Sequence, residues 1–93
     1  MTNTTQPQVE MCQNPNARLY HVRHALTDTA ILLDREQYHT ATGIAEIILR
    51  IPGISGCYIS SYQLHAYKAR MYSWDEIEPH ILEALRAFTE PRP

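Results

Sequence analysis

The dipeptide Pro52-Gly53 separates two different patterns of apolar residues in this chain. After it, Ile54–Tyr62 and Leu64–Tyr72 are rich in Tyr, Ile, Ser and Cys, which favours strands, and residues 60–63 are the expected hairpin connection. Before it, in segment 40–51, the apolar residues follow the i, i+3, i+4 spacing of an amphipathic helix: Ala41, Ile44, Ala45, Ile48 and Ile51. The two patterns therefore predict a helix over 40–51, with Thr40 or Thr42 as its N-cap, followed by a β-hairpin.

A second helix is predicted to begin at Ser73-Trp74-Asp75-Glu76. The Ser73 hydroxyl can bond the Glu76 amide, and the Glu76 carboxylate can reach back, which is a capping box. Pro79 lacks an amide donor, so we expect it to delay or kink the regular part of the helix. One apolar stripe follows this start and is formed by Ile77, Ile81, Ala84, Leu85 and Phe88.

The N-terminal half predicts strands. Arg18–Leu26 alternates, with Tyr20, Val22 and Leu26 on one side, as in a half-buried strand. The apolar run 30–33 suggests a brief second strand, and 34–37 is either a turn or the start of a helix. The predicted order is β, short β, α, β, β, α. We therefore expect an α+β fold, with a small, mostly antiparallel sheet and two helices packed on one face.

The length of 93 residues predicts a single domain. We expect the α+β domain to span residues 17–89. The polar residues 1–16 hold too little apolar surface to fold alone and are expected to be flexible or loosely docked. Residues 90–93 are expected to be a tail, because Pro91 and Pro93 cannot continue a helix.

Charge and hydropathy exclude several classes of protein. Eight Lys and Arg against ten Asp and Glu give a formal charge of −2, which does not fit a generally basic nucleic-acid binder or an acidic disordered tail. No segment approaches the roughly 20 apolar residues that cross a bilayer. The N-terminus has neither a basic nor an apolar signal region, so a cytoplasmic location without membrane attachment is expected.

Motifs that would carry chemistry are missing from the sequence. Cys12 and Cys57 form no CxxC pair, and the five histidines have no spacing typical of a metal site. We interpret Cys57 as a small buried apolar residue and Cys12 as a loosely ordered thiol. No nucleophile elbow, phosphate loop or HExxH motif is present. We therefore expect a protein that is not an enzyme, with no catalytic residue, no cofactor and no metal site.

Tyrosines crowd the predicted hairpin and its flanks, together with two basic residues. Tyr offers a large contact area at low entropic cost, and basic groups suit the rim of a protein interface. We expect contact with a protein partner or with a second copy of the chain, and a homodimer is favoured. Stacking of single-stranded nucleic acid is less favoured because the net charge is negative. The candidate contact residues are Tyr58, Tyr62, Tyr67, Lys68, Arg70 and Tyr72.

Short motifs along nearly the whole chain give it a family resemblance. Residues 13–17 (QNPNA) resemble the TPNPNALKF start of the N-terminal domain of Nfu-type iron–sulfur scaffold proteins. Residues 51–54, 57–59 and 64–68 are similar to that domain's two later strands and to the turn before them. In the last helix the match lies in the spacing of Trp74, Ile77, Pro79 and Ile81.

This resemblance implies a small sheet with two helices and an accessory or partner-binding role. The departures are Gln63 at an apolar position and the missing CxxC, which Nfu proteins carry in a separate C-terminal domain. The cluster-carrying activity is therefore not transferred. We expect a non-enzymatic protein-interaction domain, linked to iron–sulfur cluster assembly by resemblance alone. The alternatives are a small-ligand binder, a single-stranded nucleic-acid binder and a metal-binding protein that uses several His.

Overall fold

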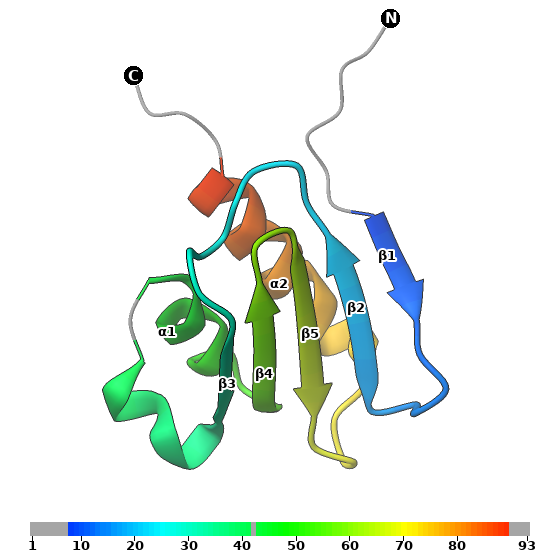
Figure 1. Cartoon of the computed structure of the whole chain (residues 1–93). Coiled ribbons are helices and arrows are strands. Elements are labelled where there is room, and N and C mark those ends of the chain that lie inside the picture. The colour runs from blue at the N-terminus through cyan, green and yellow to red at the C-terminus, as the bar shows by residue number, and fades with distance from the viewer. Residues whose placement is uncertain (1–7, 42, 90–93) are drawn as a thin grey trace, which may run out of the picture.

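The computed structural model describes residues 8–41 and 43–89 of the chain. These residues form five strands, one 3-10 helix (η1) and two α-helices, joined by loops (Figure 1). In chain order they are β1 (Gln8–Met11), β2 (Ala17–His21), β3 (Ile31–Asp34), η1 (Arg35–Thr40), α1 (Ile44–Leu49), β4 (Ile54–Ser60), β5 (Gln63–Lys68) and α2 (Trp74–Thr89).

The strands form one sheet in the order β1-β2-β5-β4-β3, and every neighbouring pair is antiparallel. Both helices lie on one face of the sheet, and Figure 1 looks onto the other face. The predicted α+β fold with two helices on one face is therefore confirmed. In the described part of the chain, no helix is long and apolar enough to cross a membrane.

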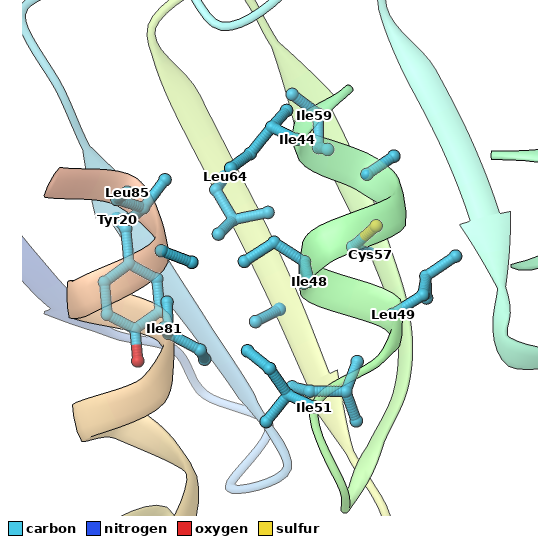
Figure 2. Close-up of a cluster of buried hydrophobic side chains, with 14 of the residues drawn as sticks. Tyr20, Ile44, Ile48, Leu49, Ile51, Cys57, Ile59, Leu64, Ile81 and Leu85 are labelled. Atoms are coloured by element: carbon cyan, nitrogen blue, oxygen red, sulfur yellow. The ribbon is translucent and has the colours of Figure 1, made fainter. Parts of the chain in front are cut away.

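The core lies between the helices and the sheet. Side chains alternate across a strand, so every second strand residue points to the helices. Cys57 and Ile59 of β4 and Leu64 of β5 are such residues, and all three have no exposed surface. Figure 2 shows Ile48 of α1 and Ile81 of α2 directed into this layer. The core is apolar, because none of the buried residues among those described is polar or charged.

The predicted elements are present, but several are shorter than predicted. Helix α1 covers only the middle of segment 40–51, and β2 stops at His21 rather than Leu26. The hairpin strands β4 and β5 end at Ser60 and Lys68 rather than at Tyr62 and Tyr72. The brief strand is β3; of the ambiguous residues 34–37, Asp34 ends this strand and the other three begin the 3-10 helix η1. A further strand, β1, was not predicted; its four residues are all exposed and pair only with β2.

The predicted N-cap of the first helix is wrong. Gly43 holds the N-cap position at a φ of 63°, and no side chain bonds the helix start. The Thr40 hydroxyl instead donates to the Gln37 carbonyl within η1 at 2.8 Å. Thr42 lies outside the described residues. A positive φ is adopted most readily by glycine, so the chain enters α1 through backbone geometry rather than through a capping side chain.

Helix α2 begins with half of the predicted capping box. The Glu76 carboxylate accepts the Ser73 amide at 3.0 Å, whereas the Glu76 amide donates to the Ser73 carbonyl and not to its hydroxyl. The helix continues through Pro79. The predicted stripe is buried except at Phe88, which is 40% exposed, because the last turn extends past the core.

Polar contacts fix α2 across the sheet. Arg18 on β2 is ion-paired with Glu78 on α2, and the Tyr20 hydroxyl donates to the same carboxylate at 2.9 Å. The Arg18 guanidinium also lies 5.1 Å from the centre of the Trp74 ring, whose Nε1 donates to the Pro15 carbonyl at 2.9 Å. These contacts attach the last helix to one face and leave the opposite face open.

Candidate interaction surface

The face of the sheet away from the helices is crossed by a row of large side chains. Pairing places one residue from each strand in line, in the order Leu32, Tyr58, His65, Leu19 and Glu10. Leu32 is 70% exposed, and the next three side chains are partly buried. We call Leu32, Tyr58, His65 and Leu19 the central row.

Aromatic rings pack around His65 at the middle of the central row. Its ring centre lies 5.9 Å from that of Tyr58 and 6.4 Å from that of Tyr67, which is nearly parallel at 11°. The Nδ1 atom of His65 is buried and has no hydrogen-bond partner among the described residues. Buried polar atoms are usually hydrogen-bonded. Because this nitrogen is not, ring packing rather than a hydrogen bond at this atom holds the His65 side chain in place.

A hollow of about 570 Å³ lies beside the central row, at the β3 side of the open face. Gly56 forms part of its floor, between Asp34 on β3 and Tyr67 on β5, which are its partners in the pairing. A Cβ atom at residue 56 would lie 3.0 Å from the Leu33 carbonyl oxygen, so the close approach of β3 favours glycine here. The missing side chain leaves the space open.

The other margin of the open face is polar. His21 Nε2 lies 2.9 Å from a Glu10 carboxylate oxygen, and His21 Nδ1 lies 3.4 Å from Gln63 Nε2. A neutral imidazole that carries its proton on Nε2 fits both contacts, donating to Glu10 and accepting from Gln63. This pair of contacts links the edge strand β1 to the rest of the sheet.

The six predicted contact residues do not share one surface. Tyr58 and Tyr67 lie on the open face, but Tyr62 is in the hairpin turn and is 55% exposed. Lys68 points to the helix side, where its Nζ donates to Asn16 Oδ1 at 3.0 Å.

The remaining two predicted residues, Arg70 and Tyr72, lie in the loop before α2, with the Tyr72 ring against Gly53. The open face instead includes Leu32, Leu19 and His65, which the sequence analysis did not place in a contact surface. The alternation of each strand contained the signal for their direction, but the pairing of β2 with β5 that unites them is not local in sequence.

The two cysteines differ in environment. Cys57 is buried in the core, and burial raises the pKa of its thiol from 9.0 to about 11. Cys12 is free and partly exposed. Within residues 8–41 and 43–89, no three His, Cys, Asp or Glu side chains are grouped so that they could hold a metal ion.

Comparisons with known proteins find likeness in the fold. No protein-family model matches the sequence, and no curated protein matches it. The solution structure of a NifU-like protein from Saccharomyces cerevisiae superposes with a TM-score of 0.69, at 22% sequence identity, over 94% of this chain and 82% of that chain. This chain has the fold of a NifU-like protein.

A second solved structure gives the same result. The crystal structure of protein SAV1430 from Staphylococcus aureus also superposes with a TM-score of 0.69, at 12% identity, over 86% of this chain and 98% of that chain. The resemblance seen in the sequence is thus confirmed for the fold. One fold serves many functions, so the function has to be argued from the open face.

Proposed function

We propose that this chain is a non-enzymatic protein-interaction domain whose open sheet face is the contact surface. The uncovered central row carries this proposal. Two helices cover one face of the sheet, while the other keeps a line of aliphatic and aromatic side chains that ends in Leu32, which is 70% exposed. Exposed apolar groups that lie together on a rigid sheet are typical of protein interfaces.

The composition of the open face favours protein over nucleic acid. None of the strand residues described at this face is Lys or Arg, because Arg18 and Lys68 both point to the helix side. Binding of single-stranded nucleic acid combines aromatic stacking with basic groups that neutralise phosphates. The central row supplies the rings without the basic groups. Tyr58, His65 and Leu19 therefore suit the apolar side chains of a protein.

A role beside iron–sulfur cluster assembly is the finer part of the proposal. It is supported by the shared fold with the yeast NifU-like protein and by the short motifs along the chain. In this role the domain holds no cluster and acts as an accessory that binds a component of the assembly machinery. A cytoplasmic location and the absence of any catalytic group belong to the same proposal.

Site-specific photo-crosslinking in cells of the source organism tests the proposal. The crosslinking amino acid p-benzoylphenylalanine is placed at Leu32 or Tyr58 on the open face, and at Met71 or Phe88 as matched controls. Both control side chains are exposed, at 87% and 40%, and lie in the loop before α2 and in the last turn of α2. Mass spectrometry identifies each adduct.

We expect one adduct from both open-face positions and none of that mass from the controls. Equal adducts at all four positions, or adducts at the controls alone, would contradict the open face as the contact surface. An adduct of twice the chain mass identifies a homodimer. A crosslinked protein that has no part in cluster assembly removes the iron–sulfur role and leaves the interaction role standing.

A further inference from the structure

We infer that the hollow over Gly56 receives an arginine or lysine side chain from the protein that the open face binds. This inference rests on the proposed function and specifies the chemistry of the partner. The residues that line the hollow include Asp34, Tyr67 and Leu32, which offer a carboxylate, an aromatic ring and an aliphatic side chain. A basic residue has a part that suits each of these three groups.

Charge on the open face favours a basic partner. Its described strand positions carry two carboxylates, Glu10 on β1 and Asp34 on β3, at opposite edges of the sheet. Apart from histidines, the strands contain two basic residues, Arg18 and Lys68. Both are engaged on the helix side, Arg18 with Glu78 and Lys68 with Asn16. A face with acidic groups at both edges is complementary to a partner with basic groups and repels a second copy of itself.

The residues around the hollow suit one long basic side chain. Asp34 and Tyr67 both pair with Gly56, so they stand on either side of a position that has no side chain. A guanidinium or ammonium group held between them would meet a carboxylate and an aromatic ring. The aliphatic stem of the same side chain would cover Leu32, which is 70% exposed.

Asp34 is held in position before any partner binds. Its Oδ1 atom accepts the backbone amide of Glu36 at 3.0 Å, and its own amide donates to Gln37 Oε1 at 3.0 Å. Oδ2 has no partner in the described part of the chain and is left for a ligand. The carboxylate therefore needs little reordering on binding, which lowers the entropic cost of the contact.

The test uses a phage-displayed library of random 12-residue peptides selected on the folded protein. Selected peptides are synthesised, and their affinities are measured by fluorescence anisotropy. Asp34→Asn removes the charge and keeps an oxygen for the Glu36 amide. Glu36→Gln is the matched control, since it removes one carboxylate two residues away that does not line the hollow. Tyr58→Ser tests the central row separately.

We expect the selected peptides to combine apolar residues with an Arg or Lys that weakens binding when it is replaced, citrulline being the neutral substitute for Arg. Asp34→Asn should weaken the basic peptide by about twofold to fivefold, as for exposed ion pairs, and leave the citrulline peptide unchanged. Glu36→Gln should change neither peptide. Higher salt should reduce the difference.

Other results separate the two proposals. Peptides that lose affinity with Tyr58→Ser but contain no required basic residue would overturn this inference and support the open face as the contact surface. Peptides that are indifferent to Tyr58→Ser, or a selection that yields no binding peptide, would count against both. Equal effects of Asp34→Asn and Glu36→Gln would show a general charge effect and would also overturn the inference.

Discussion

Replacing Tyr20 by Phe tests how strongly the buried junction between β2 and α2 holds the helix on its face. The Tyr20 side chain is fully buried, and its hydroxyl donates to Glu78 at 2.9 Å. Burial, with the Glu78 carboxylate beside it, raises the pKa of this phenol well above its usual value, so it stays protonated and able to donate. Tyr20→Phe removes this one donor and keeps the ring.

The expected loss follows from what remains after the substitution. A hydrogen bond to a charged group contributes about 1.5–3 kcal/mol, but Glu78 keeps its ion pair with Arg18 and is partly hydrated. We therefore expect the free energy of unfolding to fall by about 1–2 kcal/mol. For a domain of this size, each kcal/mol lowers the melting temperature by about 4–8 °C. Urea unfolding at neutral pH and a thermal melt measure both quantities.

Tyr62→Phe is the control, because this tyrosine is 55% exposed in the hairpin turn and should change stability by less than about 0.5 kcal/mol. An equally small loss for Tyr20→Phe would refute the reasoning. It would mean that the hydrogen bond to Glu78 in the folded protein is no stronger than the bonds that the hydroxyl makes to water in the unfolded chain. A change in the slope of the urea transition would indicate a change in the unfolded state instead.

Three further predictions test other parts of the structure. His65→Phe removes a buried nitrogen that has no partner among the described residues, and should raise stability by about 0.5–1 kcal/mol in urea unfolding; a loss of stability would contradict this. Burial raises the pKa of Cys57 from 9.0 to about 11, so stability present below pH 9 is lost as the pH rises toward 11. Between about pH 8 and about pH 10.5 the wild type should therefore lose about 2 kcal/mol more than Cys57→Ala, and parallel curves would contradict this. Gly53→Ala places a Cβ 2.8 Å from the Ile77 and Tyr72 side chains at a φ of 98°, and should cost at least about 2 kcal/mol. Gly43→Ala, with φ 63° but open space around it, should cost less in the same unfolding assay.

Elements of the fold were predictable where the signal is local. The spacing of Ile44, Ala45 and Ile48 predicts α1, and the stripe from Ile77 to Leu85 predicts α2. The capping of α1 was mispredicted because the chain uses the backbone conformation of Gly43, for which a nearby Thr gives no clue. Strand β1 has only exposed residues, so no apolar pattern marks it, and it exists through its pairing with β2.

The make-up of the open face was less predictable because it depends on pairing between distant strands. Closeness in the chain groups Tyr58 and Tyr67 with Tyr62 of the turn and Tyr72 of the following loop. The structure unites them instead with Leu19, from β2, since β2 lies beside β5. Alternation gives the face of each residue within its own strand, but only the sheet order shows which residues of other strands share it.

The distribution of charge between the two faces of the sheet says more about the kind of partner than the net charge of the chain does. A formal charge of −2 is nearly neutral and does not select a kind of partner. Alternation along β2 and β5 directs Arg18 and Lys68 to the helix side, where Glu78 and Asn16 engage them. The open face keeps Asp34 and therefore a local acidic character that the average conceals. The same alternation that builds the core thus also determines which charges a partner can meet, and it favours a basic, partly apolar segment over nucleic acid or a second copy of the chain.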